Sequence, residues 1–155
     1  DNTLDDYHVA VAHKNTLHKE QGPIKNYKYF FSKFCNVLVT PINSRENLYT
    51  FGLLPWTHII VWPGKGILLI SYPPQRIDQC SLEIKLASAT LCTKDLEDWK
   101  INILNFLEED KVIVESVQKS YRGKFKLGPP NRLEQRIIHW QEVYKEFLRA
   151  YGISF

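Results

Sequence analysis

One carboxylate in this chain stands where an apolar side chain would be expected. On a helical wheel of about 100° per residue, the segment after Cys92 has an apolar stripe about 80° wide, and Asp110 falls in its middle. A carboxylate on a buried face is costly unless it is paired, protonated or bound to a cation. We therefore expect Asp110 to form a buried salt bridge, to accept a hydrogen bond from a loop, or to bind a cation. The stripe consists of Leu96, Trp99, Ile103, Leu107, Val114, Val117 and Tyr121.

Three histidines near the start of the chain are the other candidates for chemistry. His8, His13 and His18 follow one another at intervals of five residues. Side chains five apart on an ideal helix point about 140° away from each other, so two of them can hold one ion only where a π-type turn widens the helix. The simplest interpretation is three exposed histidines on a polar segment. A zinc site made of all three is a second interpretation, but it leaves Asp110 unexplained.

A third interpretation combines the two features. Two imidazoles and one carboxylate form the facial triad of non-haem Fe(II) oxygenases, which leaves coordination positions open for dioxygen. His8, His13 and Asp110 have the required types. Metal-independent catalysis has less support. The sequence has no GxSxG motif, and the spacing of its residues implies no Ser/His or Cys/His pair. The segment Gly64-Lys65-Gly66 is too short for a phosphate-binding loop.

The elements that would position these residues can be predicted from periodicity. Residues 27–91 contain runs of β-branched and aromatic residues separated by turn residues, and 62–66 is the clearest hairpin turn. The period then changes to that of helices, with one helix expected from Thr93 to about Tyr121 and another from Asn131 to Tyr151. The pattern predicts an α+β domain with an antiparallel sheet of about four to six strands and long C-terminal helices.

Two further helical features are expected. The first thirteen residues read as a short helix capped by Asn2 or Thr3. The last helix should face the core with the apolar residues that recur at helical spacing. These residues are Leu133, Ile137, Trp140, Tyr144, Phe147 and Tyr151.

Composition limits the class of protein. The 155 residues suit one domain, and 44% hydrophobic with 24% charged residues is typical of a globular protein. The net charge of +3 is too small for a nucleic-acid binder, and no apolar run is long enough for a membrane span. Three widely spaced cysteines indicate a reducing, cytoplasmic setting. Because the chain has no methionine, we expect a processed chain or a piece of a longer one.

Two motifs resemble those of a known family. Residues 5–13, DDYHVAVAH, match the D-x-x-H-x-x-x-x-H motif of the Rieske non-haem iron oxygenases, the ring-hydroxylating oxygenase α-subunits. Residues 108–118 resemble the segment that carries the third iron ligand in that family. Residues 128–134 and the helix that follows resemble the family's C-terminus. The two motifs occur in the order that the family has.

This resemblance implies a helix-grip (START/Bet v 1-like) catalytic domain over residues 1–155. It implies that His8, His13 and Asp110 bind Fe(II) and that Asp5 bridges toward a Rieske cluster and passes electrons to the iron. The implied reaction uses O2 to hydroxylate, dihydroxylate or demethylate a small organic substrate. A ferredoxin or reductase would donate the electrons. The full-length protein would form a homo-oligomer, namely a trimer.

The chain departs from the family in one respect. A Rieske [2Fe-2S] cluster is held by C-x-H and C-x-x-H pairs, and no histidine here lies two or three residues after a cysteine. We therefore expect the cluster on a Rieske domain elsewhere, in the same or a neighbouring subunit, and little turnover by this chain alone. The alternative hypothesis is a helix-grip module that binds an apolar ligand without redox activity.

Overall fold

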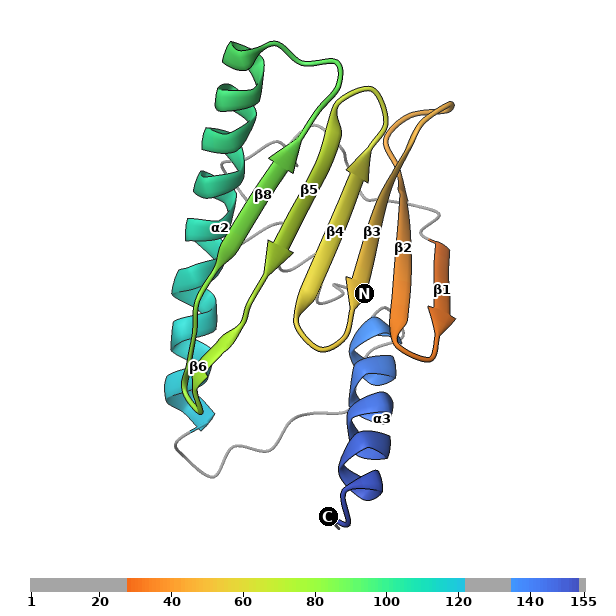
Figure 1. The fold of residues 1–155 in the computed structure, drawn as a ribbon, viewed down its shortest axis with the longest axis vertical. Coiled ribbons are helices and arrows are strands. Elements are labelled where there is room, and N and C mark those ends of the chain that lie inside the picture. Colours follow the sequence, from red (N-terminus) through yellow and green to blue (C-terminus); the bar gives the residue numbers. More distant parts are fainter. Residues whose placement is uncertain (1–27, 122–134, 154–155) are drawn as a thin grey trace, which may run out of the picture.

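The computed structural model describes residues 28–121 and 135–153, which form an α+β arrangement of one large antiparallel sheet followed by two helices. The sheet has six strands in the order β1-β2-β3-β4-β5-β8. Helices α2 and α3 follow the sheet in the chain and lie against it (Figure 1). The predicted fold class is confirmed, and the architecture is that of a helix-grip-like domain.

The large sheet consists of β1 (Lys28–Ser32), β2 (Cys35–Pro41), β3 (Asn47–Leu53), β4 (Thr57–Trp62), β5 (Gly66–Ser71) and β8 (Glu83–Ala87). A small hairpin, β6 (Pro74–Arg76) with β7 (Gln79–Cys80), separates the last two strands. The helices are α2 (Thr93–Tyr121) and α3 (Gln135–Ala150). The predicted bounds of α2 and the hairpin turn between β4 and β5 are confirmed. The predicted N-terminal helix lies outside the described residues.

Strand register decides which residues face the helices. Directly opposed residues point to the same face of a sheet, and one such row crosses all six strands. This row contains Phe31, Asn36, Gly52, His58, Ile70 and Ile84. Helix α2 covers the end of the row that lies on β5 and β8, and α3 covers the end on β1 to β3 (Figure 1).

The core forms where α2 packs on β5. Leu68 and Ile70 of the strand and Trp99 and Leu107 of the helix are almost completely buried. Trp99 and Leu107, with Leu96 and Ile103 packed against the same cluster, confirm that the first half of the predicted stripe faces the core.

The second half of the stripe does not pack. Val114 is 62% exposed and Val117 is 45% exposed. The 29 residues of α2 extend about 44 Å at 1.5 Å per residue, whereas the six residues of β5 span about 20 Å. The helix therefore outruns the sheet, and the end of its apolar stripe is left in solvent.

Helix α3 differs more strongly from the prediction. The described members of its predicted apolar face are mostly exposed, with Tyr144 at 61% and Tyr151 at 80%. The helix instead turns Arg136, His139 and Val143 toward the sheet. Two members of that face do contact the sheet side, Trp140 above Gly52 and Phe147 against Phe34. Polar contacts with β1 and β2 also set the orientation of the helix, and an apolar pattern cannot reveal them. Within the described ranges, neither helix combines the length and apolar character needed to cross a lipid bilayer.

The packing of α2 on β5 predicts a sharp difference between two adjacent residues. Leu68→Ala should lower the free energy of unfolding by roughly 2–5 kcal/mol, because it leaves a cavity in the core. Ile67→Ala is the matched control, since Ile67 lies on the opposite face and is 45% exposed. Urea denaturation of both variants checks this. Equal losses would contradict the assigned register.

Candidate functional site

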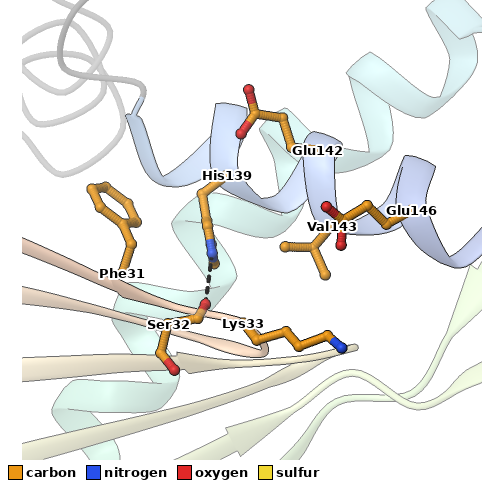
Figure 2. A pocket seen from close by; sticks show the side chains of 7 residues that line it. All are labelled: Phe31, Ser32, Lys33, His139, Glu142, Val143 and Glu146. Carbon is orange, nitrogen blue, oxygen red and sulfur yellow. Dashed lines mark hydrogen bonds between the residues drawn. The ribbon is translucent and has the colours of Figure 1, made fainter.

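Helix α3 is joined to the sheet by a chain of hydrogen bonds around a completely buried asparagine. Asn36 is 0% exposed, and its Oδ1 accepts a hydrogen bond of 2.6 Å from Arg136 Nε. Its Nδ2 lies 3.4 Å from His139 Nδ1, and His139 Nε2 lies 2.8 Å from the Ser32 carbonyl oxygen (Figure 2). A carbonyl only accepts hydrogen bonds, so Nε2 carries the proton and Nδ1 accepts from Asn36.

Glycine at position 52 allows α3 to approach the sheet closely. A Cβ atom on Gly52 would lie 2.7 Å from Trp140 Cζ2, 2.8 Å from Asn36 Oδ1 and 3.0 Å from Arg136 Nη2. These separations are shorter than van der Waals contact. The indole of Trp140 and the guanidinium of Arg136 therefore rest directly on the β3 backbone.

His58 on β4 occupies the strip of sheet between the two helices. Its row neighbours are Gly52 on β3, beneath α3, and Ile70 on β5, beneath α2. Strands lie about 4.8 Å apart, so these two neighbours are separated by roughly 10 Å, and His58 lies midway between them. We call this strip the interhelical gap: His58 with Arg136 on the α3 side and Tyr72 on the α2 side. The rings of His58 and Tyr72 meet edge to face, with centroids 6.1 Å apart.

The environment keeps the imidazole neutral. Burial, and to a lesser extent the positive charge of Arg136, together lower the pKa of His58 from 6.5 to about 4. A neutral imidazole presents one hydrogen-bond donor and one acceptor. His58 can therefore serve as a polar contact across the neutral pH range without changing its charge.

Asp110 lies at the α2 margin of this gap. It is half-buried on the sheet-facing side of the helix, one turn after Leu107. Burial raises the pKa of Tyr72, and the negative charges of Asp110 and Cys80 raise it further. The carboxylate thus acts electrostatically on a residue that contacts His58.

Of the predicted site residues, Asp110 is the one that falls within the described part of the chain. Asp5, His8 and His13, and His18 of the zinc alternative, lie outside the described residues. Within residues 28–121 and 135–153, no three His, Cys, Asp or Glu side chains are close enough together to hold a metal ion. The predicted triad takes two of its three ligands from outside these ranges.

The sequence analysis missed His58, Arg136 and Asn36. A signal existed for His58, because it is a polar residue inside the apolar run IIVW and shares its face of the strand with Ile60 and Trp62. Asn36 and Arg136 had no comparable signal. Their contact joins positions 100 residues apart, and it depends on how α3 lies on the sheet.

A hollow lies between α3 and the turn after β1. It is an open pocket of about 490 Å³ lined by Phe31, Ser32, Lys33, His139, Glu142, Val143 and Glu146 (Figure 2). Both ring nitrogens of His139 are already engaged, with Asn36 and the Ser32 carbonyl. The pocket therefore offers two carboxylates and a lysine at an open surface, and His139 serves to attach the helix.

The fold is shared with a protein of known structure. A crystal structure of the quaternary ammonium Rieske monooxygenase CntA in complex with an inhibitor aligns with a TM-score of 0.71 at 20% sequence identity. The alignment covers 91% of this chain and 43% of the CntA chain. This chain has a Rieske oxygenase-like fold. It spans less than half the length of CntA, and no family model and no curated protein matches its sequence.

The lowered pKa of His58 predicts a dependence of stability on pH. The unfolded state binds a proton near pH 6.5, and the folded state binds it near pH 4, so stability is complete above pH 6.5 and falls as the pH drops toward 4. The loss should reach up to roughly 3 kcal/mol at 1.36 kcal/mol per pKa unit. His58→Gln should remove this part of the acid sensitivity, which denaturant titrations at pH 7 and pH 4.5 would measure. An identical loss in both proteins would contradict the assignment.

Proposed function

We propose that this chain is the catalytic domain of a Rieske-type oxygenase. Its mononuclear Fe(II), held by His8, His13 and Asp110, would use O2 to hydroxylate, dihydroxylate or demethylate an organic substrate. The observation that carries the proposal is the place of Asp110, a half-buried carboxylate on the sheet-facing side of α2. This carboxylate borders the interhelical gap of a fold that a Rieske monooxygenase shares.

The donor chemistry fits ferrous iron. Two neutral imidazoles and one carboxylate are the ligands of the facial triad, and three ligands leave coordination positions open. When bound, the iron would supply the activation of dioxygen. Asp110 would contribute the negative charge among the ligands, and Tyr72, beside it in the gap, would limit the access of water from the sheet side.

Electrons would come from outside this chain. By the motif resemblance Asp5 would bridge the iron helix to a [2Fe-2S] Rieske cluster on a domain of the same or a neighbouring subunit, supplied by a ferredoxin or reductase. An interface of this kind needs exposed apolar surface. The projecting ends of α2 and α3 offer it at Val114, Tyr144 and Tyr151, which supports assembly with a further domain or in a homo-oligomer.

Metal binding tests the proposed triad. After anaerobic reconstitution with Fe(II), we expect the wild-type chain to bind one iron and His8→Ala, His13→Ala and Asp110→Asn to lose it, because each removes one of three protein ligands. Elemental analysis after desalting measures the content. Asp98→Asn is the matched control, an exposed carboxylate on the same helix, and it should retain iron.

His18→Ala separates the proposal from the histidine zinc site. It should leave iron binding intact if His8, His13 and Asp110 are the ligands. Loss of metal in His18→Ala together with retention in Asp110→Asn would favour zinc bound by the three histidines. Iron content that none of the ligand substitutions changes would refute the triad.

A second function has its own supporting observation. The buried polar groups of the interhelical gap, His58 and Arg136, would also suit a helix-grip module that binds an organic ligand without redox chemistry. Such a module would bind its ligand tightly in the metal-free protein and would be indifferent to Asp110→Asn. The iron measurements therefore separate the two functions.

A further inference from the structure

A small hairpin holds an isoleucine side chain fully in solvent. Ile77 is 103% exposed and lies in the turn between β6 and β7. Turns usually carry polar residues, and an aliphatic side chain at a turn gains free energy when another molecule covers it. The neighbouring side chains are charged, because Arg76 precedes Ile77 and Asp78 follows it. We call residues 76–78 the hairpin tip.

The hairpin that presents this tip is fixed by its own hydrogen bonds. Pro74 is paired with Cys80, and the Ser81 backbone N–H donates to the Pro73 carbonyl oxygen at 3.0 Å. Gln75 Nε2 donates to Ser81 Oγ at 3.1 Å. A preordered segment loses little conformational entropy when it binds, so the hairpin tip is suited to insert into a surface hollow.

A hollow with complementary properties lies on α3. The pocket of about 490 Å³ between α3 and the turn after β1 has apolar walls at Phe31 and Val143 (Figure 2). Glu142 and Glu146 also line it, and neither carboxylate forms an ion pair with a residue of the described ranges, 28–121 and 135–153. Lys33 adds one positive charge, so the pocket is net negative. We call this hollow the α3 pocket.

The hairpin tip matches the α3 pocket in polarity and in charge. Ile77 supplies an apolar side chain, and Arg76 supplies a positive charge on a side chain that is 71% exposed. Arg76 Nε lies 3.9 Å from Asp78 Oδ1. An exposed ion pair of this kind contributes little free energy, so it does not keep the guanidinium from an acidic surface.

The two surfaces are too far apart to meet within one chain. The hairpin leaves the sheet at β5, whereas the α3 pocket lies at β1, on the other side of the sheet (Figure 1). The distance from β5 to β1 is about 19 Å, at about 4.8 Å for each strand spacing. A hairpin arm as short as β6 extends about 10 Å. The partner that carries the complementary surface is therefore a second copy of this chain.

We propose that the hairpin tip of one copy binds in the α3 pocket of the next copy. Ile77 contacts Phe31 and Val143, and Arg76 pairs with the two pocket carboxylates. Because the two surfaces differ, the contact runs head to tail, and successive contacts close into a ring. The inference rests on the proposed function only for the homo-oligomer that this function implies.

Sedimentation velocity of the full chain measures the association. A hairpin tip is small beside a standard interface of about 1,600 Å², so one contact is weak, and ring closure strengthens the assembly by giving each copy two contacts. We expect the wild-type chain to form oligomers as its concentration rises toward about 1 mM.

Substitutions at the hairpin tip test each contact. Ile77→Ser should weaken association about tenfold or more, since a buried aliphatic side chain is lost. Ile101→Ser is the matched control, at an isoleucine of α2 that is 49% exposed, and it should leave association unchanged. Arg76→Glu brings like charges together and should weaken association about tenfold or more, whereas Arg45→Glu, at another exposed arginine, should not. Because all four positions are exposed, circular dichroism should show the wild-type fold in each variant.

A mixing experiment tests the head-to-tail geometry. A pocket variant with Glu142→Arg and Glu146→Arg should not associate, because both substituted side chains repel Arg76. It keeps an intact hairpin tip, and Ile77→Ser keeps an intact pocket. An equal mixture of the two variants should form a heterodimer and no larger species, because one of the two contacts can form. Adding Arg76→Glu to the pocket variant should restore its self-association.

Three results would overturn the interface. These are a wild-type chain that stays monomeric at about 1 mM, an oligomer that Ile77→Ser and Arg76→Glu leave unchanged, and a mixture of the two variants that stays monomeric. The proposed oxygenase function fails differently, through iron content that does not depend on His8 or Asp110. Self-association of a chain that binds no iron would keep the interface and remove the oxygenase.

Discussion

The burial of Leu68 and Ile70 beneath α2 is the contact on which the proposed site depends. Trp99 and Leu107 close over these two residues and so fix the rotation of a helix that is about 44 Å long. Asp110 lies three residues after Leu107, on the same side. The apolar packing one turn away therefore directs the Asp110 carboxylate to the margin of the interhelical gap. The free energy gained by that packing offsets the cost of desolvating the carboxylate.

Helix α3 is held by a different kind of force. Its attachment to β1 and β2 runs through Asn36, Arg136 and His139, with the glycine at position 52 permitting the close approach. Buried hydrogen bonds contribute little net stability and are costly when one partner is removed, so they specify position more than they stabilise. The result is a charged group held rigidly over the sheet, while Tyr144 and Tyr151 stay exposed.

Sequence reasoning predicted what depends on local periodicity. The bounds of α2, the hairpin turn before Gly66 and the place of Asp110 on the sheet-facing side follow from spacing and turn residues. The predicted apolar face of α3 was right for Trp140, which lies on β3, and wrong for Tyr144 and Tyr151, which are exposed. Arg136 and His139 face the sheet through contacts with residues about 100 positions away. The exposure of Val114 was also missed, since its cause is the length of β5 relative to α2. His58 could have been noticed as a polar residue at the start of an apolar strand, but its neutrality depends on burial and on Arg136.

The most direct measurement of the central claim is the anomalous scattering of crystals grown without oxygen in the presence of Fe(II), recorded above and below the iron absorption edge. The account predicts one peak at the α2 margin of the interhelical gap, within bonding distance of an Asp110 carboxylate oxygen and of one ring nitrogen each of His8 and His13. A structure with no such peak, and with Asp110 engaged by a basic side chain, would contradict it.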